Sequence, residues 1–237
     1  MVNVLDRSAE LYDLIYRFKD YKAEATRVVD RLLALKPECR TVLDVACGTA
    51  EHDRYFKNHF EVEGLDVNER FVAIARVKNP ECRYHVATMT DFDLGKRFDA
   101  VLVLFSSIGY AITLEQVAST FRCLRDHVTP GGVILVEPWF TPESWKPGHV
   151  HMVTAEADGV KVCRLNVSET RQGRSYFEFH YLVGTAEGVT HLTEEHTLGL
   201  FTVEQMKAAF GQAGLTVEYD PDGLTGRGLY VARPGAP

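Results

Sequence analysis

Residues 42–52, VLDVACGTAEH, decide the fold of this chain. The stretch begins with an apolar run typical of a strand buried on both faces, and it continues through small residues around Gly48 into the start of a helix. Such small side chains let the backbone approach a ligand closely, and the N-terminus of the following helix favours a carboxylate. Asp44, near the end of the strand, is suited to receive an ammonium group. The pattern therefore predicts a nucleoside cofactor at a strand-turn-helix junction.

A second carboxylate supports this prediction. Asp66 follows Gly48 by 18 residues and closes the next apolar run, VEGLDV. A carboxylate there can accept hydrogen bonds from both hydroxyls of a ribose, as the acidic residue does in dinucleotide-binding folds. The arrangement GxGxxG is missing, because Ala46, Cys47 and Ala50 leave one glycine in the loop, and a bridging pyrophosphate needs more bare backbone. The residues thus favour S-adenosylmethionine over NAD, and the alternative of a plain turn with a strand-end cap stays open.

Length and composition bound the class of protein. The chain has 237 residues, a formal net charge of -7 and 46% hydrophobic residues, which suits one α/β core with an elaboration. The negative charge argues against a nucleic-acid partner, since such affinity comes mainly from Lys and Arg. No signal peptide and no transmembrane-length run is apparent, so no membrane partner is expected. Five widely spaced cysteines without a CxxC pair predict neither a zinc site nor a disulfide framework, which favours the cytoplasm.

Between residues 41 and 138 strand-like runs alternate with helical patterns, which predicts an α/β fold with a Rossmann-like, doubly wound and mostly parallel sheet. The runs are TVLDVA, VEGLDV, FDAVLVLFSS and GGVILVEP. After Pro138, strand-like runs separated by the turn dipeptides DG, QG and EG predict an antiparallel β elaboration in the C-terminal part. LTVEYD and RGLYVAR are expected to return to the main sheet. Two helices are expected to begin with capping boxes, at Thr113 with Gln116 and at Thr202 with Gln205.

These patterns divide the chain into four parts. Residues 1–40 are expected to form helices that cap the site, and residues 41–140 the cofactor-binding Rossmann-like core. Residues 141–200 are expected to form an antiparallel sheet that binds substrate, and this sheet is also a candidate surface for a homodimer. Residues 201–237 are expected to supply a final helix and strands that complete the core sheet.

The motifs resemble those of a known family. VLDVACGTA followed by GLDV resembles motif I and its acidic successor in class I S-adenosylmethionine-dependent methyltransferases. Over nearly the whole chain, further segments resemble, in order and spacing, the nucleotide-linked aminosugar N,N-dimethyltransferases that make dimethylamino sugars for antibiotics: ELYDLIY, KDY, MTDFDLG, LFSSIGY, EPWF, FHYLV and TGRGL. The resemblance implies that the amino group of a dTDP-linked deoxy-aminosugar is methylated twice.

The motif and the resemblance together imply a set of site residues. The cofactor site would be formed by Tyr12, Tyr21, Asp44, Ala46, Cys47, Gly48, His52, Asp66, Val67, Thr88, Met89 and Leu104. Trp139 would face the sugar or the nucleotide. Arg164 and Arg227 would bind the pyrophosphate, for which a guanidinium fork is well suited, and Ser107 would add a hydroxyl to the same anion.

Three positions depart from the family pattern. The family usually has Asp before the Met of GDM, near the adenine amine, where this chain has Thr88. The Thr88 hydroxyl is then the remaining acceptor. An N-terminal tyrosine that some relatives place near the sugar corresponds to Val4, and a histidine three residues after the strand arginine corresponds to Val167. The sugar, and whether its amine is at C3 or C4, is therefore not predicted.

Two residues are candidates for catalysis. Methyl transfer to an amine is an in-line displacement in which alignment supplies much of the acceleration, so a strong base is optional. Tyr110, at the C-terminal edge of a parallel strand, is a candidate to hold the amine or pass its proton to water, and the alternative is a packing role. His180, in FEFHYLV, is the second candidate, against a surface or core role. Glu137 either orients a partner or only closes a strand.

Other patterns are interpreted as structural. Four histidines lack a third ligand at metal spacing, so no metal site is predicted: His149, His151, His191 and His196. The alternating aromatic residues of one strand indicate sheet packing or a subunit contact: Tyr176, Phe177, Phe179 and Tyr181.

Three rival functions stay open. The first is an O- or carboxyl-methyltransferase of another small metabolite, in which Arg164 and Arg227 would serve no pyrophosphate. The second is a non-catalytic protein that binds S-adenosylmethionine. The third is a nicotinamide oxidoreductase, which needs the missing phosphate-binding glycines.

Overall fold

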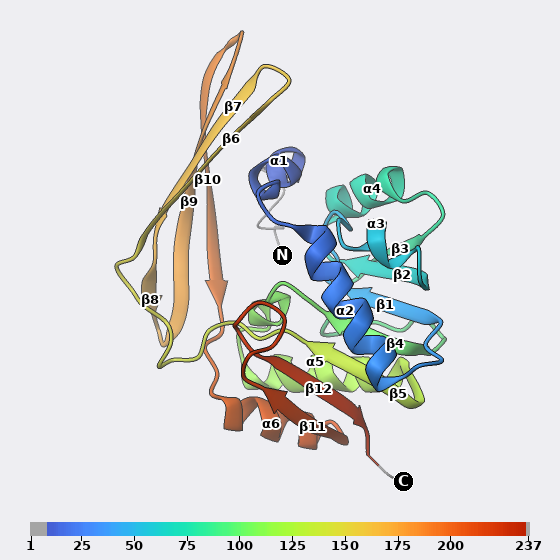
Figure 1. Ribbon diagram of the computed structural model, residues 1–237. Helices are drawn as coiled ribbons and strands as arrows, with labels where there is room; N and C mark the ends of the chain where they lie inside the picture. Colours follow the sequence, from blue (N-terminus) through green and yellow to red (C-terminus); the bar gives the residue numbers. More distant parts are fainter. Residues whose placement is uncertain (1–8, 236–237) are drawn as a thin grey trace.

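The computed structural model describes residues 9–235, so Val4 lies outside the described residues. A seven-stranded sheet has the order β11-β12-β5-β4-β1-β2-β3 (Figure 1). Its strands are β1 Thr41–Val45, β2 Glu61–Asp66, β3 Arg83–Val86, β4 Phe98–Val103, β5 Val128–Val136, β11 Leu215–Asp220 and β12 Leu229–Pro234. β1 to β5 pair in parallel, whereas β12 is antiparallel to both β5 and β11. The predicted fold class is confirmed, and the two last strands join the main sheet as expected.

Helices cover both faces of this sheet because every central strand is apolar on both sides. One face packs on α2 Tyr21–Leu35 and α3 Asp53–Phe56, with α4 Glu69–Lys78 against β3 through Tyr84. The other face packs on α5 Leu114–Asp126 and α6 Val203–Gln212. Three short elements complete the helical part: η1 Ala9–Leu11, α1 Tyr12–Tyr16 and η2 Ser107–Tyr110.

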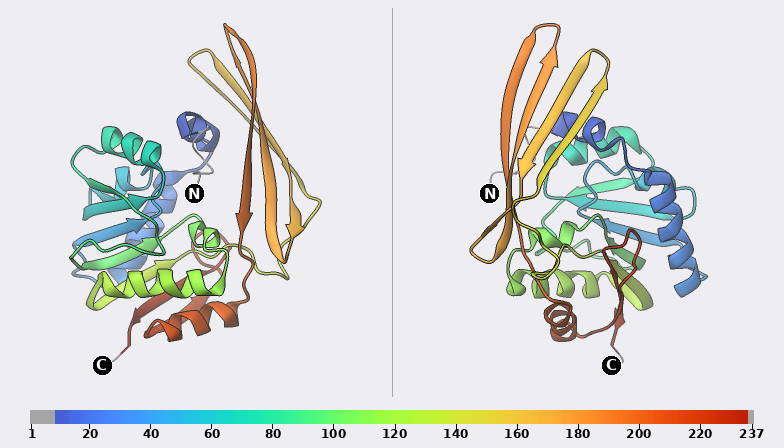
Figure 2. Two further views of the ribbon diagram at one scale, coloured as in Figure 1. Left: turned by 180° about the vertical axis from the view of Figure 1, so that it is seen from behind. Right: turned by 60° about the vertical axis from the view of Figure 1, so that its left-hand side comes forward.

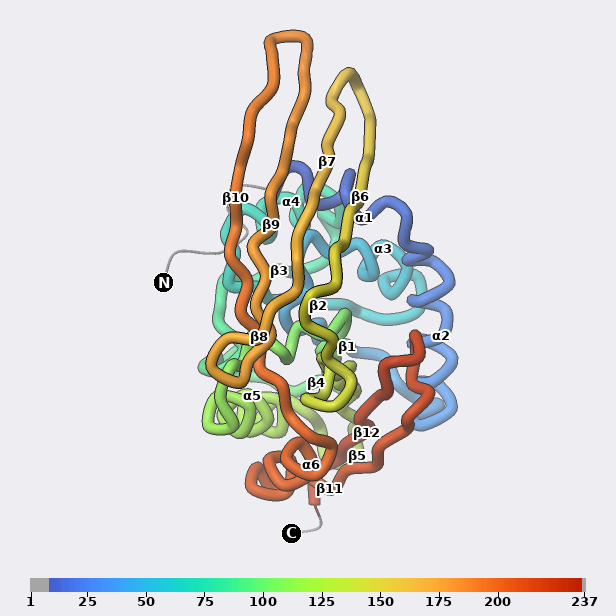
Figure 3. Tube along the Cα trace, turned by 90° about the vertical axis from the view of Figure 1, so that its left-hand side faces the viewer, coloured from blue at the N-terminus to red at the C-terminus, as the bar shows by residue number. Residues whose placement is uncertain are grey.

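A second, antiparallel sheet has the order β10-β9-β7-β6, with a short β8 beside β9. Its strands are β6 Val150–Ala157, β7 Val160–Val167, β8 Glu169–Arg171, β9 Arg174–Thr185 and β10 Gly188–Leu198. The predicted turns Asp158-Gly159 and Gln172-Gly173 have positive φ at both residues, as type I′ hairpins require. Figure 3 shows these long hairpins in front of the core.

The antiparallel sheet stands opposite the carboxyl ends of the parallel strands, and α1 lies between the two (Figures 1 and 2). Tyr16 of α1 accepts a hydrogen bond from Arg164 of β7 at 2.9 Å, and Arg17 donates to the carbonyl of Glu156 at 2.7 Å. One face of the sheet turns Phe177, Phe179 and Tyr181 into a buried cluster with Ile15. The N-terminal segment therefore lies between the two sheets and joins them.

Some local details differ from prediction. The short strands β3 and β8 were not among the predicted runs, because four and three residues carry too little periodicity to be distinguished from loops. The capping box at Thr202 is complete, with the reciprocal bond from Gln205. That at Thr113 is only half formed: Thr113 caps the helix, but the Gln116 side-chain oxygen finds no partner among residues 9–235. None of the helices described is long and apolar enough to cross a bilayer.

Candidate active site

The site lies where the strand order reverses. β1 pairs with β2 on one side and with β4 on the other, and ligands of open α/β sheets bind at such a switch point. After β1 the loop takes positive φ at Ala46, Gly48 and Ala50, each 59°. Gly48 was expected to turn the chain, but two alanines share its left-handed conformation at a steric cost. The loop therefore bends sharply and presents backbone toward the cleft.

Asp66, at the end of β2, holds this loop. Its carboxylate accepts hydrogen bonds from the backbone N–H groups of Gly48 at 2.9 Å and Asn68 at 2.8 Å. Burial nevertheless raises the pKa of the Asp66 carboxyl, and the backbone donors oppose that rise. Asn68 in turn caps α4 by accepting from the N–H groups of Arg70 and Phe71. One residue thus links the loop, β2 and α4 at the predicted ribose position.

A pair of buried acids lies beneath the loop. Asp44 is 2% exposed and Asp53 is fully buried. Burial, reinforced by mutual repulsion of the two carboxyls, raises the pKa of Asp44 well above its usual range. Burial also raises the pKa of Asp53 to about 7, although Tyr84 donates a hydrogen bond to it at 3.0 Å. The charges of Lys78 and Lys57 oppose this rise for Asp53. An ammonium group bound at Asp44 would offset the repulsion between the two carboxyls.

Phenol rings form the opposite side of the cofactor region. Tyr12 lies 4.6 Å from Tyr16 and 4.9 Å from Phe71, measured between ring centroids. Burial raises the pKa of Tyr12, and smaller contributions come from Tyr16, Tyr21, Tyr110 and Asp66. These groups are therefore close together, and their electron-rich faces suit a sulfonium or ammonium cation.

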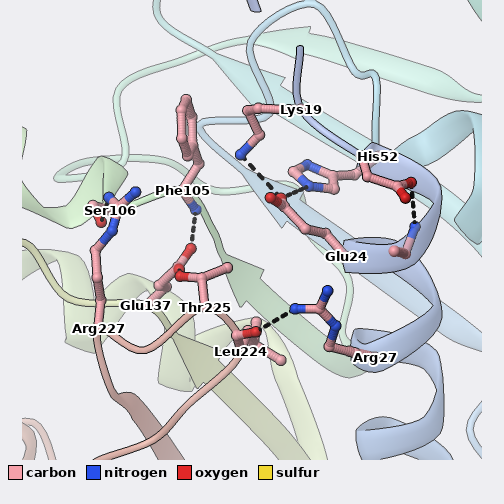
Figure 4. Close-up of polar contacts among 12 residues, drawn as sticks. Lys19, Glu24, Arg27, His52, Phe105, Ser106, Glu137, Leu224, Thr225 and Arg227 are labelled. Carbon is pink, nitrogen blue, oxygen red and sulfur yellow. Dashed lines mark hydrogen bonds and ion pairs between the residues drawn. The ribbon is translucent and has the colours of Figure 1, made fainter. Parts of the chain in front are cut away.

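His52 belongs to a network at the base of α2. Glu24 accepts from Lys19 at 2.9 Å and from the His52 ring at 3.0 Å (Figure 4). Burial opposes the Glu24 charge, but these partners outweigh it and lower the pKa of Glu24 to about 2. Tyr21 lies edge-on to His52, with 4.9 Å between ring centroids. The structure thus brings His52 and Tyr21 together, in a network that packs against the first turn of α2.

The other predicted cofactor residues follow neighbouring strand ends. Val67 is exposed just beyond Asp66, and Leu104 is buried just beyond β4. The Thr88 hydroxyl is engaged with that of Thr90 at 2.9 Å. Met89 packs at the margin of the main core. Direct contacts of these four residues with a cofactor remain predictions, as do those of Cys47.

A strained turn follows β4. Phe105 and Ser106 both have positive φ, 51° and 59°, and non-glycine residues pay for that conformation. Glu137 holds the turn by accepting from the Phe105 N–H at 2.7 Å and from the Thr225 hydroxyl at 2.6 Å (Figure 4). Glu137 therefore orients neighbouring groups, one of its two predicted roles, rather than only closing a strand.

This turn receives Arg227. The guanidinium donates to the Ser106 hydroxyl at 3.0 Å and lies 5.9 Å from the Phe105 ring centroid. Lys19 approaches the same ring to 3.4 Å, and burial lowers its pKa. Ser106, rather than the predicted Ser107, is the serine in contact with Arg227. The one-residue difference arises because the left-handed turn points Ser106 inward, and a role for Ser107 in anion binding remains a prediction.

A pocket of about 290 Å³ adjoins this turn. It is lined by residues of several segments, among them Gly109, Trp139, Phe140, Gly226, Arg227 and Tyr230. The Trp139 indole donates to the Ser175 hydroxyl at 2.8 Å, so its ring is fixed at the wall. Trp139 and Arg227 are thus brought to one pocket, as expected for groups that bind one ligand.

Arg164 lies apart from Arg227. It is 4% exposed, and its guanidinium lies over Phe179 at 4.3 Å and near the Tyr16 ring at 5.0 Å. Tyr16 in turn meets Phe105 edge-on at 5.4 Å. Two aromatic rings therefore separate the arginines, and a joint grip on one pyrophosphate remains a prediction.

Tyr110 and His180 are not brought together. The Tyr110 hydroxyl lies 2.9 Å from Nδ1 of His196, which is buried on the inner face of the antiparallel sheet. His180 is on the outer face, where it stacks with the exposed His191. The prediction for His180 fails to account for strand alternation, because neighbours Phe179 and Tyr181 take the inner face. The histidine in reach of Tyr110 is His196.

Sequence reasoning missed several residues at the site. Asp53, Lys19, Ser106 and His196 carried no recognised motif role. For Asp53 a usable signal was its place at the start of the helix that follows the strand and loop after Asp44. His196 differs, because only pairing of β10 with β9 decides which face it occupies. Within residues 9–235 no group of three or more potential metal ligands occurs.

The residues present fit S-adenosylmethionine. The buried carboxyls of Asp44 and Asp66 have raised pKa values, so a bound cation would stabilise their ionised forms. The loop at Gly48 also offers close backbone contact. The hydrogen-bonding groups of the site therefore suit the binding of a cationic nucleoside.

Comparison with known proteins agrees with this site. A family model described as a methyltransferase domain matches residues 42–132. The chain is 43% identical over 232 residues to dTDP-3-amino-3,6-dideoxy-alpha-D-glucopyranose N,N-dimethyltransferase of Streptomyces fradiae, covering 96% of this chain and 91% of the relative. It is 39% identical over 230 residues to dTDP-3-amino-3,4,6-trideoxy-alpha-D-glucopyranose N,N-dimethyltransferase of Streptomyces venezuelae, covering 95% of this chain and 97% of the relative.

Solved structures extend the match to both sheets. The crystal structure of Streptomyces venezuelae DesVI superimposes with a TM-score of 0.91 at 39% identity, covering 96% of this chain and 98% of that one. A sugar N-methyltransferase from Streptoalloteichus matches with a TM-score of 0.89 at 38% identity, covering 95% of this chain and 93% of that one. The antiparallel sheet is therefore shared as well as the core, and the chain belongs to the family of S-adenosylmethionine-dependent dTDP-aminosugar N,N-dimethyltransferases.

Proposed function

We propose that this protein transfers methyl groups from S-adenosylmethionine to the amino group of a dTDP-linked deoxy-aminosugar in antibiotic sugar biosynthesis, and that it does so twice. The observation that carries the proposal is the distribution of charge at the carboxyl end of the central sheet. Buried carboxylates and phenols line its cofactor side, whereas the guanidinium of Arg227 lies at the pocket on the other side. A cationic donor and an anionic acceptor nucleotide match these two sides.

The four parts of the chain take separate tasks in this proposal. Residues 1–40 roof the cleft and residues 41–140 bind the cofactor. Residues 141–200 provide the acceptor wall, and residues 201–237 complete the central sheet and supply Arg227. The contacts between Arg164 and Tyr16 and between Arg227 and Ser106 support this division, because each joins two of these parts.

When bound, S-adenosylmethionine supplies an electrophilic methyl group on a sulfonium. Asp66 accepts from the ribose hydroxyls, and Asp44 faces the ammonium group directly or through water. Arg227, with the Ser106 hydroxyl beside it, binds the pyrophosphate, and Trp139 packs on the nucleotide or sugar.

Tyr110 holds the amine. The lone pair of the neutral amine nitrogen forms the new bond to the methyl carbon, and the carbon–sulfur electron pair leaves with sulfur. The product ammonium then loses its proton to water. Burial raises the pKa of Tyr110, so the phenol stays protonated and acts by orienting the amine, in line with catalysis dominated by alignment.

Mass spectrometry of turnover mixtures tests the proposal. Purified protein with S-adenosylmethionine and a panel of dTDP-amino-deoxysugars is expected to give products heavier by one and by two methyl groups. A panel left unmodified, with cofactor binding intact by calorimetry, would instead favour a non-catalytic binding protein. Methylation of hydroxyl or carboxyl acceptors alone would favour the rival methyltransferase class.

We also propose that two copies pair through the outer face of the antiparallel sheet. That face exposes Met152, Leu165 and Leu182, which are 63%, 41% and 51% exposed, and apolar area of this kind marks interaction surfaces. Light scattering after chromatography checks this: the wild type should be a dimer and Leu165→Glu a monomer. A monomeric wild type at micromolar concentration would refute it.

The cytoplasm is the compartment that we propose. All five cysteines carry free thiols, as expected where thiols are kept reduced.

A further inference from the structure

We infer that His196 is a positioning residue for Tyr110: its Nδ1 accepts a hydrogen bond from the phenol O–H, so that the phenol oxygen is left to accept a hydrogen bond from an N–H of the substrate amine. This inference rests on the proposed function and deepens it. The juxtaposition that carries it is the 2.9 Å contact between the Tyr110 hydroxyl and His196 Nδ1, across 86 residues of sequence.

The His196 ring has one available orientation. It is 1% exposed, it stacks on Phe177 with 5.4 Å between centroids and an interplanar angle of 18°, and it packs against Phe179 at 4.5 Å. A buried ring packed against two aromatic neighbours, whose own centroids lie 4.9 Å apart, cannot turn away from Tyr110 without disturbing the core cluster.

The backbone beside Tyr110 is docked on the same strand. The N–H of Gly199, just after β10, donates to the carbonyl of Gly109 at 2.8 Å. A Cβ on Gly109 would lie 2.8 Å from a Leu198 methyl and 3.0 Å from the Trp139 Cβ. No side chain fits there, so η2 and β10 approach closely and hold the phenol and the imidazole in register.

The surrounding charges select the tautomer. Nε2 of His196 has no hydrogen-bond partner within residues 9–235, and the nearest acidic oxygen is Oε2 of Glu194 at 4.0 Å. A carboxylate there attracts an N–H and repels a lone pair, so the hydrogen is on Nε2 and the lone pair on Nδ1. Burial, followed by the charge of Arg164, lowers the pKa of His196 to about 3, which keeps the ring neutral.

The consequence concerns how the acceptor amine is oriented. With its own proton committed to His196, the Tyr110 oxygen offers only lone pairs to the cleft. A neutral primary amine has two N–H groups and a secondary amine one, so both orient on this oxygen with the nitrogen lone pair free. A neutral tertiary amine has none, and orientation is lost after the second methyl group. The pair thus accounts for a reaction that ends at two.

A double-mutant cycle tests the functional part. His196→Phe keeps the ring and removes the acceptor, and we expect it to lower kcat about tenfold, the size of one lost hydrogen bond of this kind, with little change in KM. In a Tyr110→Phe background the same change should have almost no further effect. Additive losses would overturn the inference, because His196 would then act independently of the phenol.

Two further variants guard against a purely structural effect. His196→Asn restores an acceptor near the Nδ1 position, and it should recover most of the lost rate. His191→Phe is the matched control on the outer face of the same strand, and it should leave the rate unchanged. Failure of rescue by His196→Asn, with the fold intact by circular dichroism, would count against the inference.

Nuclear magnetic resonance gives a readout that does not depend on turnover. Nitrogen shifts of His196 in the unliganded protein should show the Nε2–H tautomer, with Nδ1 unprotonated, from neutral pH down to about pH 5. A protonated ring or the Nδ1–H tautomer at neutral pH would overturn the inference even if the enzyme methylates aminosugars. Conversely, the expected tautomer in a protein that methylates no aminosugar would defeat the proposed function alone.

Discussion

The central sheet and the antiparallel sheet form opposite walls of one cleft, and they differ in charge. At the end of β1 and β2 the buried ionisable groups are acids, Asp44, Asp53 and Asp66. The facing sheet instead buries charges of both signs, Arg164 in contact with Tyr16 and Glu194 in contact with Tyr181. The comparison teaches that the acidic end of the central sheet is costly by itself, since buried charges of one sign repel, and that a bound cation would relieve it.

The largest effect is expected for Asp66→Ala. It removes the proposed ribose acceptor and releases the Gly48 N–H, so the dissociation constant for S-adenosylmethionine should rise about 100-fold, the value of two charge-assisted hydrogen bonds. Affinity for dTDP should stay within about twofold. Calorimetry with each ligand measures both. Glu61→Gln, exposed at the other end of β2, is the control, and an equal loss for both ligands would mean that the walls are not independent.

Arg227→Gln should weaken binding of the acceptor. Loss of the guanidinium fork beside Ser106 is expected to raise the KM for the sugar nucleotide about 30-fold, with cofactor affinity unchanged. Arg122→Gln, an exposed arginine on α5, serves as the matched control. Steady-state kinetics against the sugar nucleotide would reveal the effect. An unaltered KM would favour a methyltransferase whose acceptor lacks a pyrophosphate.

The acid pair predicts an effect on pH dependence. The folded-state pKa of Asp53 is about 7, above the value of about 3.9 in an unfolded chain. Its favourable contribution is therefore complete below about pH 4 and is lost as the pH rises through about 7. Asp53→Asn, which keeps the acceptor for Tyr84, should be more stable than wild type by about 1–2 kcal/mol at pH 8 and similar to it at pH 4. Urea unfolding at both pH values checks this, and a pH-independent difference would contradict it.

The smallest effect is expected outside both walls. Thr202→Ala removes the hydroxyl of the complete capping box on α6 and should lower the free energy of unfolding by about 1 kcal/mol. Both ligand affinities should remain unchanged in calorimetry, because Thr202 is not among the residues that line the pocket, although Met206 of the same helix is. A loss of binding would show that α6 helps to position the binding residues. Cofactor binding and acceptor binding would then not be independent.

The sequence predicted the strand-turn-helix unit around Gly48 because its signals are local. Gly48 and Asp66 lie at the ends of adjacent buried strands, where a short motif specifies strand, turn and helix together. The left-handed conformations of Ala46 and Ala50 were not predictable, since alanine rarely adopts them without tertiary support. The roles of Cys47, Val67, Thr88, Met89 and Leu104 stay predictions, because they depend on a ligand.

The residues proposed to bind the acceptor were harder to predict because they come from distant parts of the sequence. Ser106 contacts Arg227, which follows it by 121 residues. The left-handed turn places Ser106, rather than the expected Ser107, in this contact. His180 and His196 illustrate the same point. His180 lies on β9 and His196 on the neighbouring β10, and the pairing of these strands decides which of the two side chains is on the inner face.

The amino-acid sequence by itself determined the order of strands and helices, the cofactor turn and the family, since hydrophobic period and short motifs are local properties. Only the tertiary structure decided which residues face each other across the cleft. Burial and charge act through space, so the pairing of Tyr110 with His196 and the acidic cluster beneath Gly48 exist only once the two sheets and α1 have packed together.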